Sequence, residues 1–476
     1  MRSKIETDSE SSNLKRKLYI RVLENNLIGL RELGQRLGPI QRGTFRKRYE
    51  NILGLLEVKV QVPAVTALAQ HYAPPMRCFT FRDFQLVLIL EEYDQILDLP
   101  LEGRVPYKHL EQHVSIPTLA GIMKSHPREL EGRLVTRRGV RGFPKKYLET
   151  YLHQLADKED WEIFMDVLAL VIYGVLVFPN QEDLVDYDAI GVFIAVKTLA
   201  ENPVSAILAD TYTTLDLWHE RRKRKMACCL SALYVWLVSR IAERAVGFRC
   251  PVELALKRGP ELRGGDEWKQ FFAGLNETKI QWQPLWQSRS HLAYSCGKYR
   301  NVPFVETKCC INYNPVLAQR QFGYPIKGAP TPASLIALLF YYEDRNVTEV
   351  LRQVRNAWKN VIYMYRDSRP WATDREVPYC RQWVAERVKE VKLPFKLDAP
   401  SSKNNEQMPD VESEEVKRLK EEIERLKGVN AKAVSDLQSL CHDYVDLKKD
   451  YEERTKAHEE LMRKQKAERD YTFRIK

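Results

Sequence analysis

Apolar residues recur at helical spacing along most of residues 14–398. Amphipathic or wholly apolar stretches, separated by Pro, Gly and Asn, cover residues 145–157, 160–178, 187–200, 203–218 and 226–245. The same periodicity predicts further helices over residues 14–62, 86–97, 332–342, 347–366 and 381–392. Strand-like alternation is nearly absent outside residues 76–84. The pattern predicts a mainly α protein: a large helical globular domain with little sheet, followed by a long C-terminal coiled-coil helix.

Two stretches depart from the general pattern. Residues 250–330 are irregular and rich in Trp, Pro, Gly and Asn, so we expect long ordered loops that lie over the helical core. Residues 167–178 are an uninterrupted apolar run, but a membrane-spanning helix needs about twenty such residues. Asp166 precedes the run and Pro179-Asn180 follows it. We therefore predict a buried core helix and no transmembrane segment.

Changes in composition suggest where the domains begin and end. Residues 1–13 are polar and rich in Ser and Glu, as in a disordered tail. The helical domain is predicted to cover residues 14–398, followed by a polar linker over 399–410. Beyond the linker the chain is charged and heptad-periodic, so we predict a coiled coil over residues 411–470 and a short tail over 471–476.

The predicted coiled coil has a continuous seam when Val416 is set at position a of the heptad. The seam then consists of Val416, Leu419, Ile423, Leu426, Asn430, Ala433, Leu437, Leu440, Tyr444, Leu447 and Leu461. β-branched residues at a with Leu at d favour two strands, and the single Asn430 at a fixes their register. Flanking charges such as Glu422 and Lys427 suit parallel chains. We predict a parallel homodimer, with a heteromeric coil as the alternative.

The charge balance allows an anionic partner. The chain has 75 Lys plus Arg against 64 Asp plus Glu, a net charge of +11. Residues 410–476 hold about 16 basic and 17 acidic side chains, so the whole excess lies in the preceding part of the chain. This excess permits attraction to nucleic acid or to acidic proteins, although it is spread over a large surface.

The cysteines and the first residues indicate the compartment. Nine cysteines are irregularly spaced, and residues 1–13 contain no apolar signal region. We therefore expect reduced thiols in a cytosolic or nuclear protein. Cys228-Cys229 begin an apolar helix, where at least one thiol is expected to face the core.

The strongest charge feature is the basic run Arg221, Arg222, Lys223, Arg224 and Lys225. Such a run could be bound by the acidic groove of a nuclear-import receptor or by phosphates. The alternative is a solvated turn between two helices. A second basic group, Arg137-Arg138, Arg141 and Lys145-Lys146, contains Gly139 and Gly142 and resembles a flexible loop.

Cysteine and histidine provide one candidate metal group. His291, Cys296, Cys309 and Cys310 could supply four zinc ligands from Pro- and Gly-rich loops. However, the usual C-x2-C spacing is absent, and two adjacent cysteines fit poorly at two corners of one tetrahedron. Buried thiols are the favoured interpretation, and we expect no metal.

Carboxylates provide one candidate catalytic group. Glu182, Asp183, Asp186 and Asp188 could bind the magnesium of a nuclease or transposase. The alternative is that Asn180 caps the next helix and Asp183 lies in its first turn. The common phosphate-binding and hydrolase motifs are absent, and no motif marks Lys308 as the lysine of a Schiff base. We therefore expect no enzyme activity and no cofactor.

Several segments in order carry a family resemblance. They are RCFTFRDFQL at 77–86, LEEYDQILDLPLEGRVPY at 90–107, YGVLVFPN at 173–180, LVDYDAI at 184–190, CCLSALYVWLVSRI at 228–241, YSCGKYRNVPF at 294–304, INYNPVLAQRQFGYP at 311–325 and QWVAERVKEVKLPF at 382–395. Together they resemble a plant-specific domain of unknown function that is similar to the aminotransferase-like plant mobile domain. The family usually has a Pro-Thr pair where this chain has Leu88-Ile89.

The resemblance implies a setting rather than a reaction. The family has no established activity, and plant mobile domains occur in transposon-related genes and in nuclear proteins linked to gene silencing. We therefore expect a non-catalytic interaction or scaffold protein that self-associates through its coil and lies in the nucleus or otherwise the cytoplasm. Other protein partners are expected, and no membrane. A transposon-derived nucleic-acid-associated protein and an enzyme of unknown chemistry are the alternatives.

Overall fold

The computed structural model describes residues 21–101, 103–108, 115–220, 225–242, 247–282, 284, 286, 291–297, 299, 301–319, 321, 339–341, 347–365, 377–390 and 425. The chain divides into two compact units, Met1–Leu397 and Asp398–Lys476, and the fold below belongs to the first. The predicted tail at 1–13, the seam residues of the predicted coil, and Arg221, Arg222, Lys223 and Arg224 lie outside the described residues.

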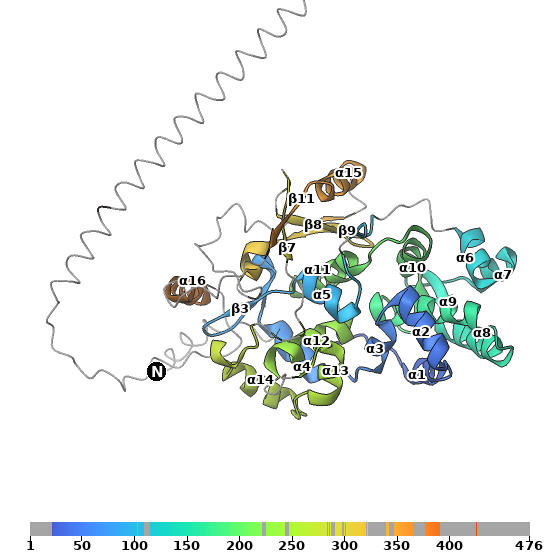
Figure 1. The fold of residues 1–476 in the computed structure, drawn as a ribbon, viewed down its shortest axis with the longest axis horizontal. Coiled ribbons are helices and arrows are strands. Elements are labelled where there is room, and N and C mark those ends of the chain that lie inside the picture. Colours follow the sequence, from blue (N-terminus) through green and yellow to red (C-terminus); the bar gives the residue numbers. More distant parts are fainter. Residues whose placement is uncertain are drawn as a thin grey trace, which may run out of the picture. The chain divides into compact units, whose positions relative to one another are not determined.

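Helices make up most of this unit, which is a mostly helical globular domain (Figure 1). The first helices are α1 Ile28–Gln35, α2 Pro39–Tyr49, α3 Ile52–Glu57, α4 Val62–Gln70, α5 Leu90–Leu97, α6 Ile116–Met123 and α7 Pro127–Arg133. They are followed by α8 Lys145–Asp157, α9 Trp161–Ile172, α10 Tyr187–Leu199, α11 Val204–His219, α12 Leu230–Ile241, α13 Pro251–Arg258, α14 Gly265–Ala273, α15 Val347–Trp358 and α16 Val377–Glu390.

The predicted central helices are confirmed. α8, α10 and α11 agree with the predictions at 145–157, 187–200 and 203–218 to within a residue at each end. α9 continues into a π-helical turn, Tyr173–Val177, and together they contain most of the apolar run at 167–178. The whole run is buried, as expected. Among the described residues no helix combines the length and the apolar character needed to cross a membrane.

Short strands form four small antiparallel sheets among the described residues. Three strands in order make the sheet of β1 Tyr72–Ala73, β2 Cys78–Thr80 and β3 Gln85–Leu86, which accounts for the strand predicted at 76–84. A second sheet contains β4 Val135–Arg137, β5 Val140–Pro144 and β6 Leu184–Asp186. The other two are β10-β9-β8 and β11-β7, formed by β7 His291–Cys296, β8 Val302–Val305, β9 Cys309–Tyr313, β10 Leu339–Tyr341 and β11 Val361–Tyr365.

These last strands correct three predictions. The segment 250–330 was expected to be loops, but it contains α13, α14 and β7 to β9. The helix predicted over 332–342 contains β10, and the helix predicted over 347–366 ends at Trp358 and gives way to β11. The physical reason is that every residue of β8 and β9 is buried, so these strands lack the alternation of a half-exposed sheet.

α5 and α11 lie at the centre of the unit. In Figure 1, β7, β8, β9, β11 and α15 lie on one side of them, and α4, α12, α13 and α14 lie on the other. α5 is therefore buried on all sides, including its charged residues: Glu91, Glu92 and Asp94 are each at most 1% exposed. Isolated buried charges are unfavourable, so each of these carboxylates requires a partner.

The three acids of α5 bind to three different neighbours. Glu92 forms an ion pair with Arg240 of α12. The Glu91 carboxylate accepts a hydrogen bond of 2.6 Å from the backbone N–H of Ala293 in β7. The Asp94 carboxylate accepts one of 3.2 Å from the N–H of Leu101. These contacts hold α12, β7 and the segment after α5 around one helix.

A second buried group joins the first sheet to the C-terminal strands. The Arg77 guanidinium lies 3.0 Å from the Asp216 carboxylate of α11 and donates to the Asn312 side chain of β9 at 3.1 Å. The Tyr72 hydroxyl donates to the same Asp216 at 2.8 Å. Arg77 and Asp216 are both buried, so this pair acts as a structural bridge between distant segments.

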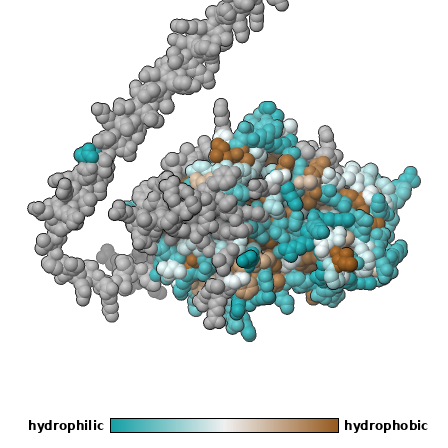
Figure 2. All heavy atoms as spheres, viewed as in Figure 1, coloured by the Kyte–Doolittle hydropathy of each residue, from teal (hydrophilic) through white to brown (hydrophobic). Residues whose placement is uncertain are grey.

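The surface is mostly hydrophilic on the face shown in Figure 2, with separate apolar spots. Large exposed apolar side chains among the described residues include Val105 and Ile362, which are 49% and 57% exposed. Single exposed apolar residues are ordinary on a protein surface. Val105 differs because it belongs to a pocket.

Candidate anion-binding site

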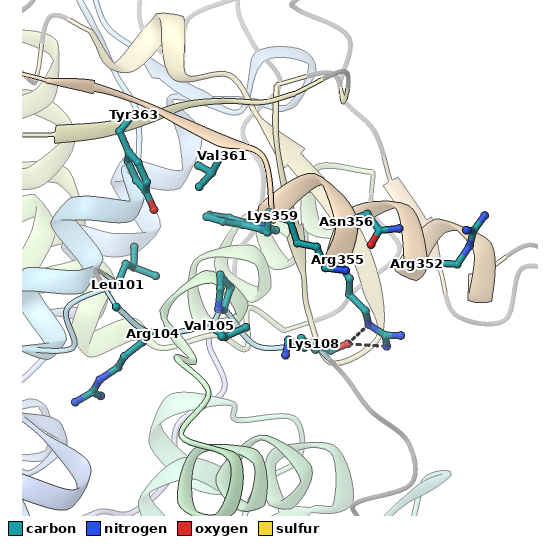
Figure 3. Close-up of a pocket in the computed structure, with 13 residues that line it drawn as sticks. Leu101, Arg104, Val105, Lys108, Arg352, Arg355, Asn356, Lys359, Val361 and Tyr363 are labelled. Atoms are coloured by element: carbon teal, nitrogen blue, oxygen red, sulfur yellow. Dashed lines mark hydrogen bonds between the residues drawn. The ribbon is translucent and has the colours of Figure 1, made fainter.

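A pocket of about 560 Å³ lies between the segment after α5 and the junction of α15 with β11 (Figure 3). Its apolar and aromatic lining consists of Leu101, Val105, Pro106, Trp358, Val361 and Tyr363. Its cationic lining consists of Arg104, Lys108, Arg352, Arg355 and Lys359, and Gly103 and Asn356 complete it. No acidic side chain is among the described residues that line it. The volume is within the range of about 300–1,000 Å³ that is usual for small-ligand sites.

Backbone hydrogen bonds hold one wall of the pocket in place. Asn202, which precedes α11, donates its N–H to Val105 O at 2.8 Å and accepts from Tyr107 N at 2.9 Å. The Asn202 side-chain amide also donates to Leu99 O and Pro100 O, each at 3.0 Å. Asn202 is fully buried. The wall is thus fixed to the helical core before any ligand binds.

The opposite wall is α15, which is attached to the first wall by Arg355. The Arg355 Nε and Nη2 atoms donate to Lys108 O at 3.0 and 2.8 Å, as Figure 3 shows. Leu351, Val354 and Ala357 of α15 are buried against the core. Since residues three or four apart share a helix face, the cations of α15 lie on faces that the core leaves uncovered.

The pocket keeps positive charge after its ion pairs are counted. Three cations pair with acids outside the lining: Arg104 with Glu50 at 2.9 Å, Lys108 with Glu201 at 3.9 Å and Arg352 with Glu349 at 2.7 Å. Five cations and three carboxylates leave a net charge of +2. Among the described residues, no acid pairs with the exposed Lys359 ammonium. In Figure 3, Arg104 and Arg352 lie at opposite ends of the site.

The aromatic lining is the end of a stack that begins in the core. The rings of Tyr313 and Phe304 are 5.0 Å apart and inclined by 13°, and Phe304 is 6.3 Å from Trp358 at 23°. The Trp358 indole N–H donates to Pro303 O at 2.7 Å, which sets the plane of the ring. Three nearly parallel rings therefore lead from buried β9 to the pocket.

The acidic residues singled out in the sequence have structural partners. Asp186 caps α10 by accepting from Ala189 N at 2.8 Å, and Asn180 donates to the same carboxylate at 2.8 Å. The expectation that Asn180 is the cap and Asp183 a first-turn residue is wrong: Asp188 occupies the first turn, and Asp183 lies in a turn with φ +52°. Asp186 wins because it lies three residues before the N–H that it caps.

The fold brings Lys308 to these acids. Its ammonium lies 4.0 Å from Asp186 and 3.7 Å from Asp188. Burial alone would lower the pKa of Lys308, but the carboxylates of Asp186, Glu306 and Asp188 together raise it. Burial, followed by the charge of Asp186, raises the pKa of Asp188 to about 6. A lysine held in its charged form by several acids is a poor nucleophile, which suits an ion-pair cluster.

The candidate zinc ligands are distributed over two sheets. His291 and Cys296 lie at opposite ends of β7, and Cys309-Cys310 are adjacent on β9. Burial raises the pKa of Cys296 to about 12, and burial together with Glu306 raises the pKa of Cys309 well above its usual range. The Cys309 thiol donates to Glu306 at 3.3 Å. Among the described residues no three His, Cys, Asp or Glu side chains are arranged to hold a metal ion.

The two basic segments differ. Of the run at 221–225 only Lys225 is described, and it pairs with Glu182. The group at 137–146 is not a flexible loop, because β4 and β5 form a hairpin there and α8 begins at Lys145. The Arg141 guanidinium lies over the Tyr187 ring at 5.1 Å. Lys145 is buried beside Glu149 at 3.0 Å, whereas Lys146 is exposed.

The pocket was missed in the sequence, although part of it has a visible signal. Arg352, Arg355 and Lys359 follow one another at helical spacings of three and four residues, so they share a stripe of α15. Arg104 and Lys108 come from a segment nearly 250 residues earlier. Only the packing of α15 against that segment brings the two groups together.

Comparison with known proteins gives a family but no activity. Neither the curated proteins nor the solved structures contain a match to this chain. The family model described as a domain of unknown function (DUF7745) matches residues 30–389. These residues contain all the described helices from α2 to α15 and both walls of the pocket. The chain belongs to the DUF7745 family.

Proposed function

We propose that this protein is a non-catalytic interaction protein whose globular domain binds an anionic ligand in the basic pocket. One observation carries the proposal: five cations surround an apolar floor that no acidic side chain of the described residues enters. Apolar walls reduce the screening of nearby charges, so an anion is attracted more strongly there than at an open surface. The net charge of +11 would help such a ligand approach.

Self-association is the second part of the proposal. A parallel homodimer through residues 411–470 would carry two basic pockets on one particle. A ligand with several anionic groups would then bind more tightly than to a single chain, because the second contact becomes intramolecular. This suits a scaffold, and the likeness to the plant mobile domain is the reason for proposing that the scaffold acts in the nucleus.

A nucleic-acid-associated protein of transposon origin is the second candidate. The basic pocket and the excess of positive charge support it, since phosphate contacts supply much of the affinity for nucleic acid. The two candidates share the anionic ligand and differ in what carries it.

The pocket is tested by removing two of its cations. The double variant Arg352→Gln/Lys359→Gln should elute from a heparin column at clearly lower salt than the wild type, because fewer counterions are released on binding. Both side chains are exposed, so the fold should be retained. Each lost anion contact is expected to lower the slope of log K against log salt by about 0.7–0.9.

A matched control separates the pocket from overall charge. Lys146→Gln/Lys257→Gln removes two exposed cations from α8 and α13, outside the pocket. It should elute close to the wild type. Equal shifts in the two double variants would mean that only net charge matters, and the proposed site would be rejected.

Nuclear location is tested at the basic run. Replacing Arg221 to Lys225 with Gln should move a fluorescent fusion from the nucleus to the cytoplasm, because an import receptor reads clustered cations through an acidic groove. The measurement is the ratio of nuclear to cytoplasmic fluorescence. An unchanged ratio in a folded variant, or a wild type that never enters the nucleus, would contradict the prediction.

A further inference from the structure

The chemistry of the pocket narrows the class of anion. After its ion pairs are counted, the site carries a net charge of +2 from Arg104, Lys108, Arg352, Arg355 and Lys359. A phosphate monoester carries a charge of about −1.5 to −2 at neutral pH, whereas one carboxylate carries −1. A single phosphate group therefore matches the charge of the site better than a single carboxylate does.

The floor of the pocket narrows the class further. Trp358 lines the pocket, and its ring continues the stack of Tyr313 and Phe304. Its indole N–H is already bonded to Pro303 O, so the ring is held in place before a ligand arrives. A flat aromatic group would extend this stack, and base–aromatic stacking contributes about 1–3 kcal/mol.

We infer that the pocket binds a nucleotide unit, with its base against Trp358 and its phosphate at Arg355 and Lys359. The inference rests on the anion-binding function proposed above and adds the identity of the ligand. Arg355 is already fixed by its bonds to Lys108 O, and Lys359 stands one residue after Trp358. One short segment of α15 thus offers both the ring and the cations.

The test is a calorimetric titration of the full-length protein with three related compounds. Adenosine 5′-monophosphate has the base and the phosphate, ribose 5-phosphate lacks the base, and adenosine lacks the phosphate. The nucleotide should bind roughly tenfold more tightly than either of the others, since each of them loses one of the two kinds of contact.

Two variants assign the contacts. Lys359→Gln should weaken the nucleotide and ribose 5-phosphate by a similar factor, roughly three- to tenfold, and leave adenosine unaffected. Trp358→Leu should reduce the nucleotide to the affinity of ribose 5-phosphate. If that variant does not fold, Trp358→Phe serves instead, because it keeps a smaller ring and should keep part of the preference. Lys146→Gln is the control and should bind like the wild type.

The outcomes separate the two levels of the proposal. Equal binding of the nucleotide and ribose 5-phosphate would overturn the role of the base and leave the anion site standing. Absence of nucleotide binding with heparin retention intact would overturn the inference alone, and loss of both would reject the proposed function as well. A 5′-phosphorylated single-stranded oligonucleotide that binds more tightly than the mononucleotide would assign the unit to a strand; equal binding would assign it to a free nucleotide.

Discussion

Replacing Glu92 with Gln is expected to destabilise the globular domain by about 3–5 kcal/mol, since it removes one partner of a buried ion pair. Arg240 and Glu92 are both completely buried and pair with each other. The Arg240 guanidinium also donates to Gln281 O at 2.7 Å, and Trp236 donates to Glu92 at 2.7 Å. Gln can accept the bond from Trp236, but it cannot neutralise Arg240. Denaturant unfolding followed by tryptophan fluorescence would measure the loss.

Glu91 is the matched control in the same helical turn. Burial raises the pKa of Glu91 to about 8, against the opposing hydrogen bond from Ala293 N, so the acid is mostly neutral at pH 7. Glu91→Gln therefore removes no charge there and should cost little near pH 7. If Glu92→Gln unfolds no more easily than Glu91→Gln, the buried ion pair is not a major source of stability.

The same control predicts a pH dependence. Because the folded-state pKa of Glu91 lies above the ordinary value of 4.5, its contribution to stability is complete below pH 4.5 and is lost as the pH rises through about 8. The wild type should lose about 1.4 kcal/mol per pH unit relative to Glu91→Gln over that window. Unfolding free energies of both proteins at pH 6 and pH 8 would check it, and parallel pH profiles would contradict it.

Charges placed in the predicted seam should abolish self-association. Leu426→Glu/Leu440→Glu puts two acids at d positions of each helix, where they would face each other in a dry interface. In sedimentation experiments the wild type is expected at twice the 55.7 kDa mass of the chain and the variant at the single-chain mass. This is the second large effect, because a coiled coil has no other apolar surface to hold it together.

The control for the coil uses outward positions. Ala431→Glu/Ser439→Glu adds the same charge at positions b and c of the predicted register, and it should remain dimeric. If the wild type itself sediments as a single chain, the homodimer is wrong and a heteromeric coil becomes the remaining form of the prediction.

The helical character of the domain could be predicted because helix signals are local. The stretch 145–157 became α8, Lys145–Asp157, since its apolar residues repeat with the helical period over several turns. The short strands could not be predicted in this way. β11 pairs with β7, which begins seventy residues earlier, and the register joins Tyr365 to His291. No local pattern contains that pairing.

The sequence by itself determined the mainly helical class, the buried nature of the run at 167–178, the burial of Cys228-Cys229 and the resemblance to a family. Each depends on neighbours in the chain, or on ordered motifs that can be read directly. Only the tertiary structure decided that Glu91 and Glu92 lie in the core, that Asp186 and Lys308 meet, and that Arg104 and Lys359 line one pocket. A charged residue is read as a surface residue until a distant segment provides its partner, and that partner depends on packing rather than on sequence spacing.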